Sequence, residues 1–412
     1  MTWFTRRIRA AALCALAAGL GPSAAAADDL LLPLFDTTAS HAIILDGDTG
    51  AVLMSKNADA PIPPASMSKL MTAEVVFQAL KQGRRALDEV LPVSEEAFRK
   101  EGSTMYLNLG DDPTIADLLR GLIVQSGNDA SIALAEGMAG TEARFAELMT
   151  RRAREIGLTN SRFANASGLP APNHEMSVRD LAVLARHIIY TYPDYYTFYQ
   201  EREFTWAGVT QRNRNPLLAL EAVGGDGLKT GFTEEAGFGI VGSAERDGRR
   251  VIAVLAGLDS RRARSREVVT ALNWGFREFE PRVLAEKGAV VGAVDVWIGS
   301  QAQAQVALAE DLKVVVPVLG GDVSAARIVY EGPVAAPVAV GDRLATLRVE
   351  VAGVGPVEAA LTAAEAVEKG GYLARLSAGF GFAARWAWEQ ARAQLFGGEA
   401  AEGDAAAASS AG

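Results

Sequence analysis

The sequence predicts an α+β domain followed by a smaller all-β domain. Strand-like apolar runs stand at both ends of the first 281 residues, and apolar residues at helical spacing fill the stretch between them. After residue 281 the composition changes to short Val- and Ala-rich runs separated by Gly-containing turns. Because strands flank a helical block, we expect the two ends of the first domain to share one antiparallel sheet. A chain of 412 residues has room for two or three domains.

Residues 1–27 have the pattern of an export signal. Three arginines precede an apolar run from Ala10 to Leu20, and an A-x-A sequence stands directly before Asp28. The apolar run is too short to span a bilayer as an anchor. We therefore expect the chain to be exported.

The only cysteine, Cys14, lies inside this segment. Cleavage as a lipoprotein just before Cys14 is an alternative, although Ala11 stands where such signals usually carry Leu. Cleavage after Ala27 would leave a chain without disulfides, which excludes a thiol enzyme and a cysteine-ligated metal site.

The overall charge also limits the possible functions. The formal net charge is −10 and the pI is near 5.1, which argues against a nucleic-acid partner. The three histidines, His41, His174 and His187, form no metal-like pair in the sequence. We expect neither a metal nor a cofactor, and we find no Ser/His/Asp arrangement.

Residues 28–281 are expected to form the first domain. Polar Gly-containing turns follow its first strand and separate its last two strands, and Asp247-Gly248 is a strong hairpin signal. Leu118, Leu119, Leu122 and Ile123 recur at helix spacing. The expected elements, in order, are strands 41–45 and 51–54, a helix from Ser66 to about Leu80, a short strand 90–93, helices 115–124, from 129, and 142–156, a loop 157–173, strands 227–232, 237–244 and 250–258, and a helix 264–279.

Residues 282–370 are expected to form a small all-β sandwich, with strands 290–297, 313–318, 326–330 and 344–351. Residues 371–397 follow as an amphipathic helix, with Arg385 and Arg392 away from its apolar side. Arg, Trp and Phe together suit a helix lying on a membrane surface, and the alternative is a helix packed on its own domain. The Ala-, Gly- and Ser-rich residues 398–412 predict a disordered tail.

The first chemical motif is Ser66-Met67-Ser68-Lys69, at the start of a predicted helix. Residues three apart lie on one helix face, with Cβ atoms roughly 5–6 Å apart. A partly desolvated Lys69 can be neutral enough to take the proton of Ser66 and make it a nucleophile. Prolines just upstream suit a helix start.

Two further motifs follow in the chain. Ser126-Gly127-Asn128 stands where a helix ends, so that Ser126 can relay a proton and Asn128 can orient Lys69 and bind a substrate amide. Lys229-Thr230-Gly231 lies on a predicted strand. Lys229 offers positive charge, Thr230 a hydrogen bond for a carboxylate, and Gly231 room for a substrate backbone along the strand edge. Each motif alone is weak, and the three in this order are a strong joint signal.

With these motifs the sequence resembles the low-molecular-weight penicillin-binding proteins, serine-type D-Ala-D-Ala carboxypeptidases of peptidase family S11. Residues 42–46, 64–71, 226–231 and 273–276 carry the resemblance, together with the β-rich domain and the terminal helix. The resemblance implies a transpeptidase-like catalytic domain of the β-lactamase and penicillin-binding class. It also implies peptidoglycan stem peptides as substrates, β-lactam antibiotics as covalent inhibitors, and peripheral attachment to the inner membrane.

The resemblance implies roles for single residues as well. Ser66 would be acylated, Lys69 would be its base and Ser126 the proton relay. The backbone N–H groups of Ser66 and Phe232 would form the oxyanion hole. The remaining implied residues bind substrate: Asn128, Lys229, Thr230, Gly231, Arg214 and Arg264. Surface salt bridging is the alternative for the two arginines, and Phe232 stands where relatives often carry His.

Four other functions share these motifs. A β-lactamase of the common class would need an E-x-x-L-N segment between Asn128 and Lys229, and there is none. A murein endopeptidase usually lacks the second domain, and a transpeptidase differs only in its acceptor. The complete set of polar residues argues against a non-catalytic wall-binding scaffold.

Overall fold

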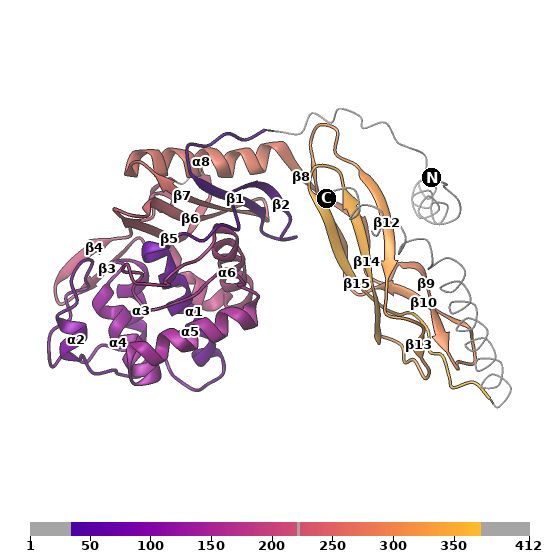
Figure 1. The fold of residues 1–412 in the computed structure, drawn as a ribbon, viewed down its shortest axis with the longest axis horizontal. Coiled ribbons are helices and arrows are strands. Elements are labelled where there is room, and N and C mark those ends of the chain that lie inside the picture. Colours follow the sequence, from indigo (N-terminus) through magenta and orange to yellow (C-terminus); the bar gives the residue numbers. More distant parts are fainter. Residues whose placement is uncertain (1–33, 221–222, 372–412) are drawn as a thin grey trace, which may run out of the picture.

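The computed structural model describes residues 34–220 and 223–371. The predicted signal (1–27), the tail (398–412) and the terminal helix beyond residue 371 lie outside the described residues. Within the described residues, no helix is both long and apolar enough to cross a membrane. Figure 1 shows a mixed α/β body on one side and a β-rich body on the other.

The first body is built on a five-stranded antiparallel sheet with the order β2-β1-β7-β6-β5. The expectation that the two ends of the domain share one antiparallel sheet is confirmed. Strands from opposite ends of the domain meet at the β1–β7 pair. The strand β5 lies at one edge of the sheet. The strands are β1 (His41–Asp46), β2 (Val52–Lys56), β5 (Gly225–Thr233), β6 (Gly237–Arg246) and β7 (Arg249–Leu258).

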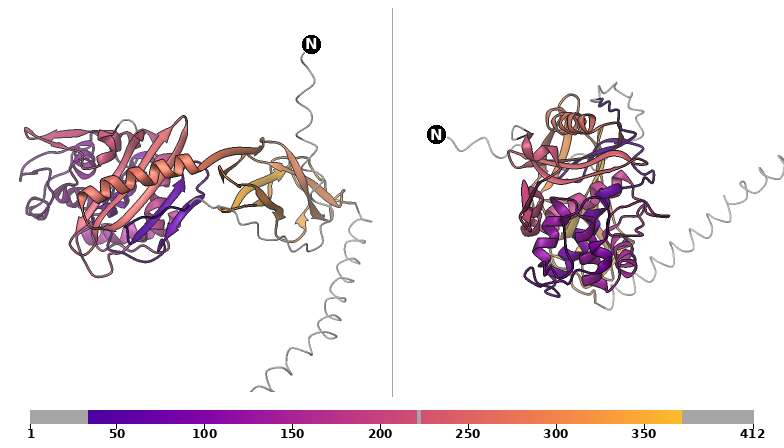
Figure 2. Two further views of the ribbon diagram at one scale, coloured as in Figure 1. Left: turned by 90° about the horizontal axis from the view of Figure 1, so that it is seen from above. Right: turned by 90° about the vertical axis from the view of Figure 1, so that its left-hand side faces the viewer.

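Two layers of helices cover this sheet (Figures 1 and 2). The helix α8 (Arg261–Glu278) packs its Trp274 and Leu272 on one face, and the helical block covers the other face around Phe77 and Phe145. A small hairpin of β3 (Glu203–Trp206) and β4 (Val209–Arg212) adjoins this block. The elements of the block are η1 (Ala65–Ser68), α1 (Lys69–Lys81), α2 (Glu95–Phe98), α3 (Ile115–Ile123), α4 (Asn128–Ala139), α5 (Glu142–Ile156), α6 (Val178–Thr191), α7 (Pro193–Tyr196) and η2 (Thr197–Gln200). The short helix η3 (Pro216–Ala219) packs Leu217 into the apolar cluster on the α8 side of the sheet.

The expected strand 90–93 is wrong. Val90 makes a single bridge to Thr114, and no strand forms there. Pro92 has no N–H to offer a ladder, so the pairing stops after one residue. The helix expected from 264 begins earlier, at Arg261, because the Ser260 side chain caps it by accepting from Ala263 N at 3.1 Å.

The β-rich body contains a six-stranded sheet, β12-β14-β15-β10-β9-β13, and a two-stranded sheet, β11-β8. Val314 and Val316 of the small sheet pack with Val294, Leu347 and Leu361 of the large one in a single apolar core. The strands are β8 (Phe279–Ala285), β9 (Val290–Trp297), β10 (Gln303–Leu308), β11 (Leu312–Pro317), β12 (Val323–Val329), β13 (Val334–Ala335), β14 (Arg343–Val351) and β15 (Gly355–Ala363).

Candidate active site

The first motif folds into a tight turn that leads into α1. Ser66 lies in η1 and is partly exposed, while Lys69 is the first residue of α1 and is 1% exposed. The Lys69 Nζ is 3.1 Å from the Ser66 Oγ. Ala65 has φ 48°, a left-handed conformation that is unusual for alanine and shapes the turn. The predicted Ser–Lys pair is therefore in hydrogen-bonding contact.

The amine of Lys69 meets two groups besides the serine. It donates to Asn128 Oδ1 at 2.8 Å and to the backbone carbonyl of Ser167. Burial lowers the pKa of Lys69 to about 7, and the positive charge of Arg214 acts in the same direction. Near neutral pH a large fraction of Lys69 is thus neutral and able to accept a proton.

The second motif joins α3 to α4 and faces the third motif. Ser126 has φ 61°, which directs the chain sharply between the two helices. Its Oγ accepts a hydrogen bond from Lys229 Nζ at 2.9 Å. The Asn128 side chain is oriented by a hydrogen bond from its Nδ2 to the Glu101 carbonyl, at 2.8 Å. That bond leaves Oδ1 of Asn128 pointing at Lys69.

The third motif lies on the edge strand β5. Lys229 and Thr230 are 2% and 5% exposed. Burial, followed by the charges of Lys69, Arg214 and Arg264, lowers the pKa of Lys229 well below its usual value. Four basic side chains, Lys69, Lys229, Arg214 and Arg264, thus converge in a chain of net negative charge, and this arrangement favours an anionic ligand.

The two arginines lie near the motifs. Arg214 donates to Ser103 Oγ at 2.5 Å, and Asn128 N donates to the Ser103 carbonyl at 2.6 Å. Arg264 is buried, and its Nε has no hydrogen-bond partner among the described residues. Within the described ranges neither arginine forms a salt bridge, so the alternative of surface salt bridging finds no support.

Gly231 has a packing reason different from the expected one. A Cβ at this position would lie 3.0 Å from Met67 Cγ and 3.1 Å from the Pro64 carbonyl. The missing side chain therefore allows β5 to approach the turn that carries Ser66. Close approach of backbone is a usual reason for glycine in a strand.

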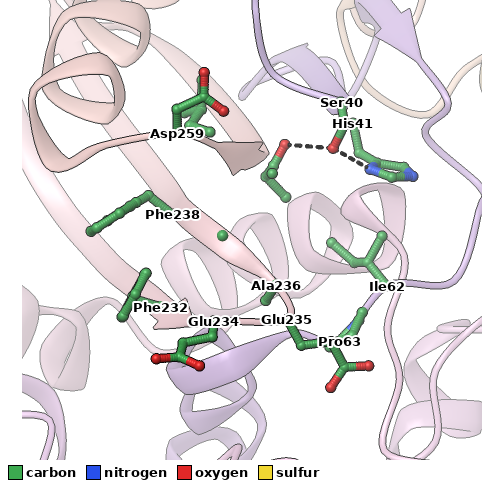
Figure 3. A pocket seen from close by; sticks show the side chains of 14 residues that line it. Ser40, His41, Ile62, Pro63, Phe232, Glu234, Glu235, Ala236, Phe238 and Asp259 are labelled. Atoms are coloured by element: carbon green, nitrogen blue, oxygen red, sulfur yellow. Dashed lines mark hydrogen bonds between the residues drawn. The ribbon is translucent and has the colours of Figure 1, made fainter.

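Phe232 follows the third motif and is half exposed, with its ring stacked on Phe238 at 4.2 Å between centroids. It is the one predicted site residue that also lines a neighbouring pocket of about 610 Å³ at the end of the sheet (Figure 3). His41, Glu234 and Asp259 are among the other lining residues. This pocket lies beside the converging motifs and does not contain Ser66.

Sequence reasoning missed the Ser167 carbonyl. The contact is made by a backbone atom in an irregular loop, so no residue type marks it in the sequence. In the part of the chain that the structure describes, no group of three or more His, Cys, Asp or Glu side chains is arranged to hold a metal ion. The described site offers a serine, an amine within hydrogen-bonding distance of it, and a cluster of basic side chains.

Comparisons with known proteins identify the family of the chain. A family model described as D-alanyl-D-alanine carboxypeptidase (Peptidase_S11) matches residues 24–260, and one described as the C-terminal domain of penicillin-binding protein 5 matches residues 279–369. The D-alanyl-D-alanine carboxypeptidase DacC of Escherichia coli is 36% identical over 343 residues, which are 81% of this chain and 85% of DacC.

Solved structures show the same likeness. Penicillin-binding protein 5 of Haemophilus influenzae aligns with a TM-score of 0.73 and 33% identity, covering 82% of this chain and 99% of that one. Penicillin-binding protein D2 of Listeria monocytogenes, solved in the ampicillin-bound form, aligns with a TM-score of 0.55 and 30% identity, covering 60% of this chain and 100% of that one. The chain belongs to the D-alanyl-D-alanine carboxypeptidases of peptidase family S11, the low-molecular-weight penicillin-binding proteins.

Proposed function

We propose that Ser66 is the residue acylated in this serine-type D-Ala-D-Ala carboxypeptidase and that Lys69 is its general base. The observation that carries the proposal is the buried amine of Lys69, 3.1 Å from Ser66 Oγ, with a pKa lowered to about 7. A base whose pKa lies near the working pH combines a sizeable neutral fraction with useful proton affinity. A serine that loses its proton to such a base becomes a competent nucleophile.

In the proposed acylation step, Ser66 Oγ attacks the carbonyl of the penultimate D-Ala of a peptidoglycan stem peptide. The Oγ–C bond forms while the proton moves from Oγ to Lys69 Nζ. Backbone N–H groups of Ser66 and Phe232 stabilise the negative oxygen, and each donor of this kind contributes roughly 3–4 kcal/mol. The amide C–N bond then breaks and the terminal D-Ala leaves as its amine.

The leaving amine needs a proton, and Ser126 is proposed to deliver it. Ser126 Oγ accepts from Lys229 Nζ at 2.9 Å, so its own hydrogen is free to point into the site. As Ser126 gives this proton to the amine, it takes up the proton that Lys69 received from Ser66, so Lys69 is neutral again and Ser126 remains a hydroxyl. Water then hydrolyses the ester on Ser66 and restores the enzyme. This route replaces one difficult step by two easier ones.

The α-carboxylate of the terminal D-Ala is the proposed anionic ligand of the cationic pocket. Lys229 and Thr230 would bind it directly, and Arg214 and Arg264 would add to the positive potential that draws it in. Asn128 would bind a substrate amide, and Gly231 would allow β5 to lie close to the serine turn. A penicillin carries a carboxylate and a reactive carbonyl, so it would acylate Ser66 in the same way.

The test is mass spectrometry of a pentapeptide ending in D-Ala-D-Ala after incubation with the enzyme. We expect loss of the mass of one alanine residue, together with covalent labelling of the chain by fluorescent penicillin. Hydrolysis of penicillin without release of D-Ala would favour a β-lactamase instead. A cross-linked peptide cut with the free pentapeptide left intact would favour an endopeptidase.

Export to the periplasm and attachment to the inner membrane through residues 371–397 belong to the same proposal. They rest on the signal pattern in residues 1–27 and on the amphipathic pattern near the C-terminus. Sedimentation with anionic lipid vesicles tests the attachment, since a chain ending at residue 370 should stay in the supernatant while the full chain sediments.

A further inference from the structure

The loop between α5 and α6 contacts Lys69, the proposed general base. Residues 157–173 form no helix or strand, yet the Ser167 carbonyl accepts a hydrogen bond from Lys69 Nζ. Ser167 is 1% exposed. Within the described residues, the one backbone bridge of this loop joins Arg162 to Glu175 and does not include Ser167. Side chains must therefore hold the turn around Ser167, and the group that fixes this carbonyl also fixes one contact of Lys69.

That group is Asn165. Its Oδ1 accepts from the backbone N of Ser167 at 3.2 Å, from Ser167 Oγ at 3.2 Å and from the backbone N of Gly168 at 2.8 Å. Its Nδ2 donates to the Leu169 carbonyl at 2.8 Å. Four hydrogen bonds from one buried side chain thus define the turn over residues 165–169.

The turn over residues 165–169 also packs closely against the turn that carries Ser66. Gly168 has φ +82°, and a Cβ there would lie 2.0 Å from the Ala65 carbonyl. The backbone of the loop therefore touches the residue directly before Ser66. A second contact holds the same turn at Ala166, whose carbonyl accepts a hydrogen bond from Thr72 Oγ1 at 2.7 Å.

The contact with the Ser167 carbonyl affects the direction of the lone pair of Lys69, because a lysine amine has a limited number of hydrogen-bonding positions. A neutral amine has two N–H donors and one lone pair. The Asn128 Oδ1 and the Ser167 carbonyl can only accept, so they take the two N–H groups. The lone pair is then left to face Ser66 Oγ, which is the direction in which the proton must travel.

We propose that Asn165 is a positioning residue for the acylation step. By holding the Ser167 carbonyl against Lys69 Nζ, it directs the amine lone pair at the hydroxyl of Ser66. Asn165 touches neither Lys69 nor the substrate itself. This inference rests on the proposed roles of Ser66 and Lys69.

Several charged or titratable groups besides this turn influence Lys69. Arg214 favours its neutral form, while Asp129 on α4 and Glu142 on α5 favour the ammonium. The charge of Lys69 in turn lowers the pKa of Lys229 on β5. His174 has its pKa lowered by burial to about 4, so it is neutral at the working pH. A variant at position 165 leaves all of these groups in place.

The experiment measures the acylation rate by fluorescent penicillin as a function of pH for wild type, Asn165→Ala and Asn165→Asp. We expect Asn165→Ala to lower the plateau rate roughly 10- to 100-fold, since misplaced reacting groups cost rates of this order. The acid limb of the profile is the rise of the rate with pH as Lys69 loses its proton. The dipole of the Ser167 carbonyl stabilises the Lys69 ammonium, so losing that contact should lower the pKa of Lys69 and move the acid limb to lower pH.

Asn165→Asp keeps the acceptor oxygen and adds a negative charge. It should restore most of the plateau rate and move the acid limb to higher pH, the opposite direction. Asn160→Ala is the matched control, because Asn160 lies in the same loop and its side chain takes part in no hydrogen bond within the described residues. It should acylate like wild type.

An unchanged plateau and an unchanged acid limb in both Asn165 variants would overturn the proposal. So would an activity loss in Asn165→Ala that only follows the fraction of folded protein in a melting experiment. If Asn165→Ala does not fold, the acid limb of Asn165→Asp decides alone. Failure of wild type to label at Ser66 would instead refute the proposed function, so the two failures are distinguishable.

Discussion

Replacing Ser66 by alanine abolishes release of D-Ala from a D-Ala-D-Ala-terminated pentapeptide and labelling by fluorescent penicillin. The variant lacks the oxygen that we propose forms the acyl-enzyme, and Lys69 is left without a hydroxyl within hydrogen-bonding distance at position 66. We expect kcat to fall by roughly 10⁴-fold or more, as in other enzymes deprived of a nucleophile. Mass spectrometry of the peptide and in-gel fluorescence of the protein measure the two losses.

Ser68→Ala is the matched control for this variant. Ser68 lies two residues away in the same turn, and its buried Oγ has no hydrogen-bond partner among the described residues. Removing an unsatisfied buried hydroxyl should leave both activities intact and the melting temperature no lower. Persistent release of D-Ala by the Ser66→Ala variant would show that another residue is acylated.

The second large effect is expected for Lys69→Arg. Arginine keeps the positive charge and the hydrogen-bond donors, but its pKa lies above 12, so it cannot act as a base near neutral pH. We expect the acylation rate to fall roughly 10²- to 10⁴-fold at every pH between 6 and 9. A stopped-flow measurement of penicillin acylation follows this loss directly.

Lys81→Arg at the far end of α1 serves as the control for the same chemical change. Lys81 donates to the Thr191 carbonyl from the protein surface and lies outside the motifs. It should acylate at the wild-type rate. If Lys69→Arg retained that rate as well, the base would have to be another group.

Local signals explain which parts of the fold could be predicted. The hairpin of β6 and β7 follows from Asp247-Gly248, and α5 from its apolar spacing and its cap, Thr141, which accepts from Arg144 N. The hairpin of β3 and β4 was not predicted. Polar and apolar residues do alternate in β3, but each strand is only four residues long, β4 shows no alternation, and no side chain of either strand is fully buried. The strand β10 was missed because Gln303–Leu308 begins with small and polar residues.

The site could be predicted as far as its side chains carry a motif. The structure joins Ser66 to Lys69 and Ser126 to Lys229 by direct hydrogen bonds, although 103 positions separate the last two. Asn128 of the second motif links the two pairs by accepting from Lys69. The part contributed by Ser167 could not be predicted, because a carbonyl looks the same in every residue. The packing reason for Gly231 also depends on which turn lies opposite β5, and only the fold reveals that.

The central claim is that the amine of Lys69 is neutral enough near neutral pH to take the proton of Ser66. The direct measurement is an NMR titration of the chain labelled with ¹³Cε-lysine, with the Lys69 signal assigned by its absence in Lys69→Arg. A midpoint near pH 7, coinciding with the acid limb of the acylation rate, is the predicted result. A midpoint at the usual lysine pKa of about 10.5, with acylation still rapid at pH 7, would contradict it.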